Sequence, residues 1–145
     1  MLIPVEKRAS FAKDGFQFAR SLVGAEELSK VLKSIVTHTH SGKSSDDAAS
    51  TTWSAHHIYS EGTDYLLEKL APKVSELVGS SLLPTCAYVQ IYKKGGILPL
   101  HVDIPECEVT VTITLDYDSK ALWPLFFIAD QVVTATLDRG RCSCI

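Results

Sequence analysis

The chain has 145 residues, of which 46% are hydrophobic and 21% are charged, and its formal net charge is -3 at pH 7. This composition allows a buried core and excludes a disordered polyampholyte, and the length fits a single domain over residues 1–145. A weakly acidic chain lacks the basic surface that nucleic acid requires, and no apolar run approaches the roughly 18 residues that cross a bilayer. The first residues also lack the apolar stretch of a secretory signal, so we expect an intracellular, cytoplasmic protein that binds neither nucleic acid nor membrane.

The first half of the chain predicts helices. Residues 11–19 read as a turn and a short apolar strand. Residues 25–37 then carry one buried helical stripe, made of Leu28, Val31, Leu32, Ile35 and Val36. Residues 63–78 repeat this spacing, and Pro72 should kink that helix or split it in two. Residues 39–52, rich in Ser, Thr, Asp and Gly, predict a loop.

The second half predicts strands, at residues 86–92, 109–115, 122–128 and 131–137. In residues 109–115, aliphatic side chains should occupy one face and threonines the other. Because no helix interleaves these strands, a parallel sheet is excluded, and we expect antiparallel sheets with helices packed outside. The fold class is therefore α+β or mainly β, with residues 1–80 as helical support and residues 85–137 as the strands.

The four cysteines fall into two groups. Cys86 and Cys107 lie in or near predicted strands, so we expect both to be reduced and partly buried. Cys142 and Cys144 have no matching cysteine pair elsewhere, which disfavours a structural zinc site.

A histidine and an aspartate two residues apart give the strongest functional signal. Gly95 and Gly96 predict a tight turn, after which Pro99 would open a strand that carries His101 and Asp103. Side chains two apart in a strand project from the same face. The pair could therefore hold one metal ion, as two of the three ligands in the 2-His-1-carboxylate triad of non-haem Fe(II) oxygenases. The alternative is a solvated pair in a turn.

The stretch Tyr92-x-x-Gly95-x-x-x-x-x-His101-x-Asp103, followed by Thr110-x-Thr112 and by Trp123-Pro-Leu-Phe-Phe, resembles the 2-oxoglutarate- and Fe(II)-dependent dioxygenases, particularly their prolyl-4-hydroxylase-like branch. The resemblance implies a partial double-stranded β-helix, or jelly roll, with N-terminal packing helices. It also implies Fe(II) bound by His101 and Asp103, with 2-oxoglutarate as cosubstrate and Tyr92 as its hydrogen-bond partner. The substrate would be a protein side chain or a small molecule. The alternative for Tyr92 is a strand aromatic packed in the core.

The family's distal His and Arg have no counterpart here, since no His follows Asp103 and both Arg139 and Arg141 come too early. Residues 140–145 can be encoded so that a one-base shift reads Gly-Asp-Ala-Val-Ala, as the family would have at this place. We therefore hypothesise a chain truncated by a shifted frame, with little or no turnover. Open sheet edges and exposed apolar residues such as Trp123, Phe126 and Phe127 would then favour self-association.

Three alternatives stay open. The domain could be a catalytically dead jelly-roll module, or a splice product, that acts through protein interaction. It could instead be a cupin-like metal-binding domain in which His56 or His57 supplies the third ligand. His38 and His40 could form a His-x-His metal pair, although a position after the first helix suits their charge equally well.

Overall fold

The computed structural model describes residues 11–19, 22–40, 53–118, 120–128, 132–140 and 142–144, with the backbone alone described at 38–40, 53–57 and 142–144. It is a mixed α/β protein, and every strand pairing that it describes is antiparallel. The chain forms two compact units. The first comprises Met1–Leu28, Leu70–Leu83 and Val109–Ile145, and the second comprises Ser29–Lys69 and Pro84–Glu108. The expectation of one domain stays a prediction.

The first unit contains a three-stranded sheet of order β1-β7-β4, made of β1 (Gln17–Ala19), β7 (Cys142–Cys144) and β4 (Val111–Ile113). In its middle, Ser143 pairs with Phe18 on one side and with Thr112 on the other. The turn before β7 uses Gly140, which adopts φ 70° and donates its amide proton to the Thr114 carbonyl at 2.8 Å. Only glycine adopts that backbone conformation without strain, so Gly140 sets the direction in which β7 enters the sheet.

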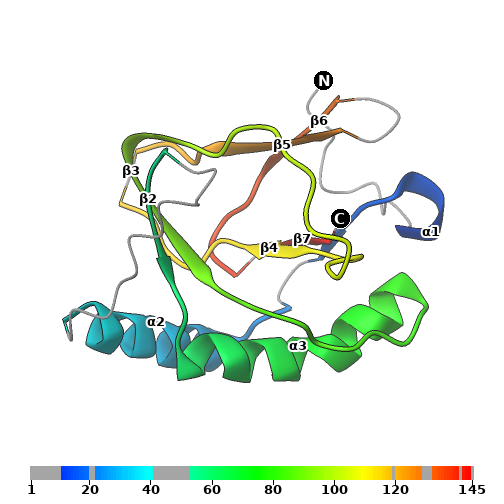
Figure 1. Cartoon of the computed structure of the whole chain (residues 1–145), viewed down its shortest axis with the longest axis horizontal. Helices are drawn as coiled ribbons and strands as arrows, with labels where there is room; N and C mark the ends of the chain where they lie inside the picture. Colours follow the sequence, from blue (N-terminus) through cyan, green and yellow to red (C-terminus); the bar gives the residue numbers. More distant parts are fainter. Residues whose placement is uncertain are drawn as a thin grey trace. The chain divides into compact units, whose positions relative to one another are not determined.

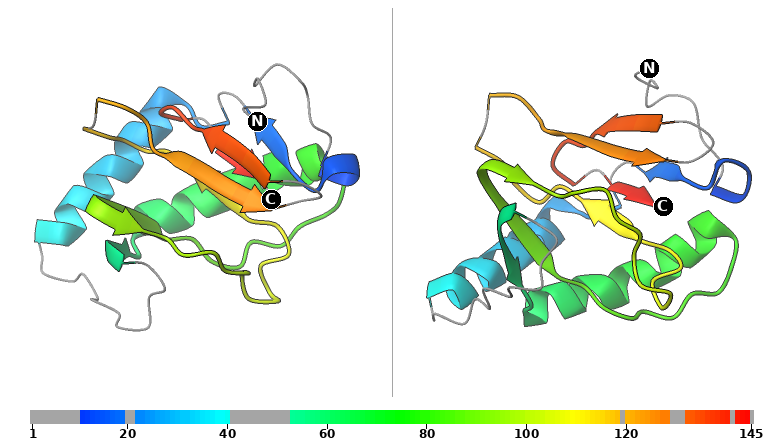
Figure 2. Two further views of the ribbon diagram at one scale, coloured as in Figure 1. Left: turned by 90° about the horizontal axis from the view of Figure 1, so that it is seen from above. Right: turned by 45° about the horizontal axis from the view of Figure 1, so that its top comes forward.

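The core of the first unit lies under a hairpin of β5 (Pro124–Ile128) and β6 (Val132–Thr136), which Figure 2 shows side by side. Phe127 pairs with Val133 on the inner face of this hairpin, and both are buried. Phe16, placed just before β1 by the one-turn helix α1 (Phe11–Asp14), meets Phe127 edge to face with ring centroids 4.9 Å apart. Phe18 packs against the same cluster. Aromatic burial therefore joins the hairpin to the strand that precedes it in the sequence by about a hundred residues.

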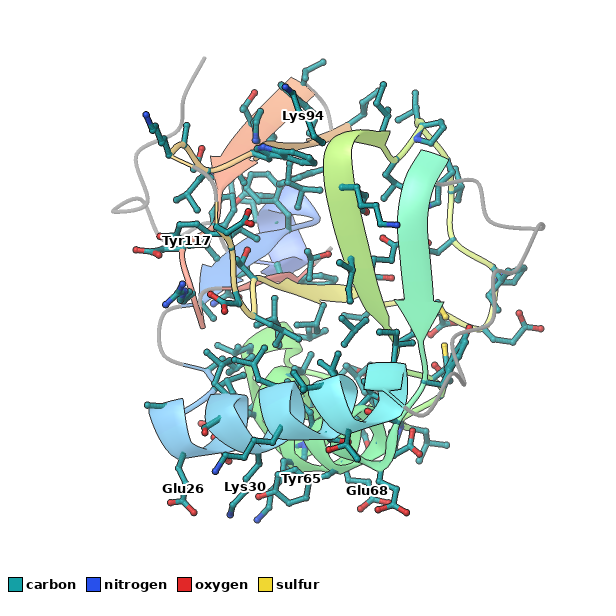
Figure 3. The ribbon with its side chains drawn as sticks, turned by 90° about the vertical axis from the view of Figure 1, so that its left-hand side faces the viewer. Glu26, Lys30, Tyr65, Glu68, Lys94 and Tyr117 are labelled. Atoms are coloured by element: carbon teal, nitrogen blue, oxygen red, sulfur yellow. The ribbon has the colours of Figure 1, made fainter. Side chains whose placement is uncertain are left out.

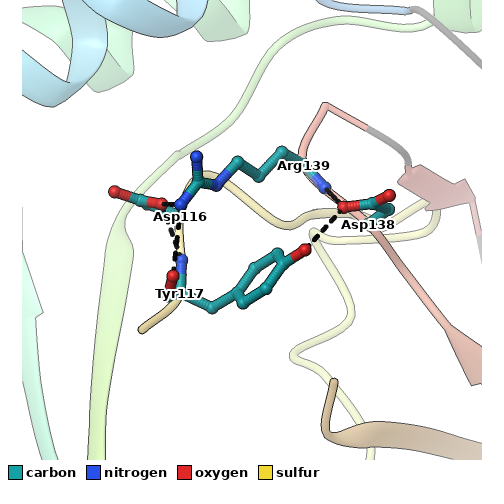
Figure 4. A network of polar contacts seen from close by, with 4 residues as sticks. All are labelled: Asp116, Tyr117, Asp138 and Arg139. Atoms are coloured by element: carbon teal, nitrogen blue, oxygen red, sulfur yellow. Dashed lines mark hydrogen bonds and ion pairs between the residues drawn. The ribbon is translucent and has the colours of Figure 1, made fainter. Parts of the chain in front are cut away.

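A surface network fixes the loop after β4 to the residues before β7 (Figure 4). Arg139 forms an ion pair with Asp116, and its guanidinium donates to the Tyr117 carbonyl at 3.2 Å. The Tyr117 hydroxyl donates to Asp138 Oδ1 at 3.0 Å, and that hydrogen bond raises the pKa of Tyr117 above its usual value. The network is solvent-exposed, so its main effect is to define loop geometry, because exposed pairs contribute little stability.

Helix α2 (Ala25–His40) is confirmed by the structure and extends three residues beyond the predicted end, so His38 and His40 belong to it. Its N-terminus is capped by Glu27, whose carboxylate accepts the Gly24 amide proton at 2.8 Å. Val31 and Ile35 are buried, as the apolar stripe predicts. Figure 3 shows Glu26 and Lys30 pointing outward from this helix.

Helix α3 (Glu61–Val78) is also confirmed, and Pro72 lies inside it without splitting it. Ser60 and Thr63 cap its start reciprocally, with each backbone amide donating to the other's hydroxyl at 3.0 and 3.3 Å. In the second unit α3 begins against α2, where Gly62 comes so close to Ser34 that a Cβ on Gly62 would lie 2.8 Å from the Ser34 Cβ. Gly62 therefore sets the distance between these two helices. None of the described helices is both long enough and apolar enough to span a membrane.

The second unit holds a two-stranded ribbon of β2 (Trp53–Ile58) and β3 (Val89–Ile97), which run alongside each other in Figure 1. The pairing is regular from Ile58 with Val89 to Ala55 with Tyr92, and then resumes only at Trp53 with Ile97. The β3 strand therefore carries extra residues, 93–96, in a bulge. Gly95 provides the φ of 83° that this bulge requires.

Three predictions about strands and turns, and one about exposure, need correction. Gly95 and Gly96 lie within β3 and form no tight turn between strands, because the bulge absorbs their irregular backbone. The predicted strand at 86–92 begins three residues late, at Val89. Of the predicted strand 109–115, Val111–Ile113 forms β4, and the whole stretch is half-buried without alternating faces. Phe127 is buried, whereas Trp123 and Phe126 are exposed as predicted. The loop was predicted at residues 39–52, but Thr39 and His40 belong to α2, and residues 41–52 lie outside the described residues.

The aromatic cluster gives a test of the core with a matched control in the next residue. Phe127 is 7% exposed and Phe126 is 59% exposed. We expect Phe127→Ala to lower the free energy of unfolding by about 3 kcal/mol, because it leaves a cavity beside Phe16. Phe126→Ala should change it by less than about 0.5 kcal/mol. Urea denaturation followed by circular dichroism measures both, and equal losses in the two variants would contradict this packing.

Candidate metal site

His101 and Asp103 lie in the second unit, after the end of β3, in a stretch (residues 98–110) that the structure describes fully and that contains no strand. The prediction that they sit in a strand is wrong, because Pro99 and Pro105 flank them and proline donates no hydrogen bond to a ladder. Leu100, Val102 and Ile104 are strongly exposed on the alternate positions. The two polar side chains still come together, as period-2 spacing in an extended chain predicts.

The geometry of the pair is defined by two contacts. His101 Nε2 lies 3.3 Å from Asp103 Oδ1, and the side chains are 34% and 37% exposed. His101 Nδ1 lies 2.9 Å from the carbonyl oxygen of Pro99. A carbonyl only accepts hydrogen bonds, so Nδ1 carries the proton and donates it to Pro99. This leaves Nε2 as the nitrogen that faces the carboxylate.

Tyr92 lies on β3, where it is half-buried and its hydroxyl donates to Gln90 Oε1. Burial, followed by the charge of Tyr88, raises the pKa of Tyr92 to about 12. Tyr92 is therefore a neutral hydrogen-bond donor at any ordinary pH. A packed aromatic and a hydrogen-bonding side chain are both compatible with this position.

The structure places groups around Asp103 that sequence reasoning did not connect with it. The charge of Asp103 contributes to raising the pKa of Tyr88 and of Cys86, in both cases behind the larger effect of burial. Cys107 lies with its sulfur 3.9 Å from that of Cys86. Cys107 is half-buried as predicted, but Cys86 is exposed, because it precedes β3 and lies in no strand. The sequence gives no signal that the two sulfurs lie close together, because 20 residues separate the two cysteines.

A third ligand is not present among the described side chains, in which no group of three or more His, Cys, Asp or Glu residues could hold a metal ion. The backbone places His56 opposite Ile91 and His57 opposite Gln90 in the β2–β3 ribbon, and their side chains lie outside the described part. The same holds for the side chains of His38 and His40. In the first unit, Arg139 is already engaged by Asp116. No family model, no curated protein and no solved structure matches this chain.

The raised pKa of Tyr92 predicts a pH dependence of stability. Its folded-state pKa of about 12 lies above the usual value of 10.0. The contribution of protonated Tyr92 to the free energy of unfolding is therefore fully present below about pH 10. It is lost as the pH rises toward 12, because Tyr92 releases its proton at a lower pH in the unfolded chain than in the folded one. Tyr92→Phe cannot ionise, so its free energy of unfolding should fall less steeply between about pH 10 and 12. Urea denaturation across this range measures the slope, and parallel curves for the two proteins would refute the assignment.

Proposed function

We propose that His101 and Asp103 hold a divalent metal ion, and that this site is the His-x-Asp half of an Fe(II)- and 2-oxoglutarate-dependent dioxygenase centre. The observation that carries the proposal is the approach of His101 Nε2 to Asp103 Oδ1, at 3.3 Å, while His101 Nδ1 is occupied by Pro99. The enzymatic part of the proposal rests in addition on the resemblance to that family.

The donor set fits a divalent ion. Two ligand atoms each about 2.1 Å from one ion are about 3.0–3.4 Å apart for angles between octahedral and tetrahedral. The observed separation of 3.3 Å falls in this range. The hydrogen bond from Nδ1 to a backbone carbonyl is the outer contact that metal-bound histidines commonly make, and it aims Nε2 at the ion.

The proposed fold is a partial double-stranded β-helix with N-terminal packing helices. Three features support it: the strand pairings are antiparallel, the two long helices precede most of the strands, and β7 inserts between β1 and β4 out of sequence order. Non-sequential antiparallel neighbours are typical of jelly rolls and Greek keys. We extend the proposal to Tyr92 as a hydrogen-bond donor to the 2-oxoglutarate carboxylate, which would require its hydroxyl to leave Gln90.

When bound, Fe(II) would supply the redox chemistry that couples decarboxylation of 2-oxoglutarate to hydroxylation of a protein side chain or a small molecule. This chain would contribute two ligands and a fixed imidazole tautomer. The described residues offer the cosubstrate no available guanidinium, because Arg139 is paired with Asp116.

Metal binding is the first prediction of this proposal. The chain should bind Mn(II), a spectroscopic substitute for Fe(II). Loss of an outer partner of a metal ligand typically weakens metal binding by about 10–100-fold, so Asp103→Ala, which removes a ligand itself, should weaken it more. His101→Ala should have a similar effect. Electron paramagnetic resonance of free Mn(II) measures the affinity directly.

Glu106→Gln is the matched control, because Glu106 is an exposed carboxylate three residues from Asp103. Its affinity for Mn(II) should equal that of the unchanged chain. If Glu106→Gln and Asp103→Ala weakened binding equally, the metal would be held by general negative charge, and the proposed site would be wrong. Loss of Mn(II) binding in His56→Ala or His57→Ala, as well as in Asp103→Ala, would favour the cupin-like alternative.

Turnover is the second prediction. We expect the purified chain with Fe(II), ascorbate and 2-oxoglutarate to form little or no succinate, because two protein ligands hold iron more weakly than three. Succinate is measured by mass spectrometry against a reaction without iron. Iron-dependent succinate formation that is lost in Asp103→Ala would overturn the expectation of inactivity, while it would support the proposed metal site.

A catalytically silent binding module is the second candidate, favoured by the outer face of the β5–β6 hairpin. Phe126, Ile128 and Val132 are exposed there, and Ile128 pairs directly with Val132. These three side chains are uncharged, so the face could meet its own copy without like-charge repulsion, which makes a second copy of this chain the proposed partner. Sedimentation velocity decides between the candidates: a stable dimer without Mn(II) binding favours the module, and a monomer that binds Mn(II) favours the metal site.

A further inference from the structure

Two cysteine thiols meet in the second unit. The sulfurs of Cys86 and Cys107 are 3.9 Å apart and share a weak hydrogen bond, and the Thr85 hydroxyl lies 3.9 Å from the sulfur of Cys107. A disulfide has a sulfur–sulfur distance of about 2.04 Å, so the two atoms need to approach by about 2 Å. Rotation about the two Cα–Cβ bonds moves sulfur atoms over such a distance.

The backbone around each cysteine leaves room for that approach. Cys86 lies in residues 81–88, which form neither helix nor strand. Cys107 ends a turn in which its amide donates to the Ile104 carbonyl at 2.9 Å. Neither residue belongs to a strand, so a small adjustment breaks no ladder hydrogen bond. Cys86 is exposed, so a small oxidant in solution reaches it directly.

We propose that Cys86 and Cys107 form a reversible intramolecular disulfide that restrains the loop carrying His101 and Asp103. The bond would close the chain between residues 86 and 107, which includes the whole of this loop. The loop has few packing contacts of its own, since Leu100, Val102 and Ile104 are exposed. A covalent tie at Cys107, beside the turn that follows Asp103, removes conformations from it. This inference does not depend on the presence of a metal.

The oxidant of the proposed disulfide formation is a hydroperoxide. One cysteine, as its thiolate, attacks the peroxide, its sulfur bonds to oxygen as the O–O bond breaks, and hydroxide leaves and is protonated to water. The second thiol then attacks that sulfenic sulfur, the S–S bond forms, the S–O bond breaks, and a second water leaves. The two sulfurs together lose two electrons, which the peroxide oxygens gain. A thiol reductant reverses the change by thiol–disulfide exchange.

The surroundings of the pair set its pH response. Burial, then the neighbouring Cys107 and further the charge of Asp103, raise the pKa of the Cys86 thiol. The attacking species is a thiolate, so oxidation at Cys86 should accelerate with rising pH. The raised pKa of the Cys86 thiol lowers its thiolate fraction at neutral pH, so its reaction with peroxide should be slow there.

The test uses the full chain and hydrogen peroxide. The reduced protein is treated with a stoichiometric amount of peroxide, remaining thiols are blocked, and the chain is digested with trypsin without reduction. Trypsin separates the two cysteines into peptides 74–93 and 95–120, while Cys142 and Cys144 leave in a third peptide. We expect peptides 74–93 and 95–120 to appear joined, at a mass about 2 Da below their sum, and to separate on reduction.

Two variants make the result specific. Cys86→Ser should abolish the joined species, whereas Cys142→Ser, which removes a thiol outside the pair, should leave it in place. Linkage of peptide 95–120 to the C-terminal peptide, a covalent dimer, or peroxide-treated Cys86 and Cys107 that remain unlinked would each overturn the proposal. These readouts use the unchanged chain first, so they do not depend on whether a variant folds.

Hydrogen exchange then tests the effect on the loop. Amides in residues 98–106 should exchange more slowly in the oxidised chain than in the reduced one, and those in α3, outside the closed segment, should not change. Equal exchange of residues 98–106 in both states would show that the disulfide forms without restraining the loop, which would overturn that part of the inference.

Discussion

The register break between β2 and β3 is the constraint on which the candidate metal site depends. Regular pairing ends at Ala55 and Tyr92, and β3 then carries its extra residues around Gly95 before Ile97 meets Trp53. A bulge bends its strand and leaves backbone groups unpaired, so the chain leaves the ribbon soon after it. With Pro99 following, no further ladder forms, and His101 and Asp103 lie in a segment that belongs to no strand.

Outside a paired strand, His101 and Asp103 are held less rigidly and are more accessible to solvent. Ligands on a paired strand are held by the ladder, whereas here the fixed elements near the pair are the Pro99 carbonyl and the turn from Ile104 to Cys107. An exposed pair can be reached by solvent ions and by small oxidants. In the proposed site, the pair would also have to become ordered when it binds a metal ion, which would reduce the affinity unless something else restrained the loop. The nearness of two thiols to the end of this loop offers one such restraint.

Sequence periodicity predicted the helices because their signal is local. The stripe through Val31 and Ile35 extends over three turns, and each residue reports the same buried side. The strands were harder to predict, because pairing depends on partners that are remote in the chain. β7 is only three residues long, yet it lies between two strands, and its pairing with Phe18 and Thr112 follows from no pattern within 142–144.

The site shows the same division between local and remote information. Spacing alone predicted that His101 and Asp103 share a side, and the structure bears this out although the strand that was expected to hold them does not form. The sequence predicted a tight turn at Gly95, because glycine is common in turns. A bulge can require the same positive φ as a turn, so the residue type alone does not distinguish the two. The approach of Cys86 to Cys107 depends on how residues 81–88 return toward the loop, and nothing in the spacing of the cysteines encodes it.

The orientation of His101 finally constrains what can occupy the space beside it. With Nδ1 donating to Pro99, a neutral imidazole presents its Nε2 lone pair to a carboxylate oxygen, and two acceptors repel each other at 3.3 Å. The proposed divalent ion would remove this repulsion, because it would take Nε2 and the carboxylate oxygen as two of its ligands. The proposed metal site therefore depends on the Pro99 carbonyl, which fixes the imidazole tautomer, as much as on the two side chains that would be the ligands.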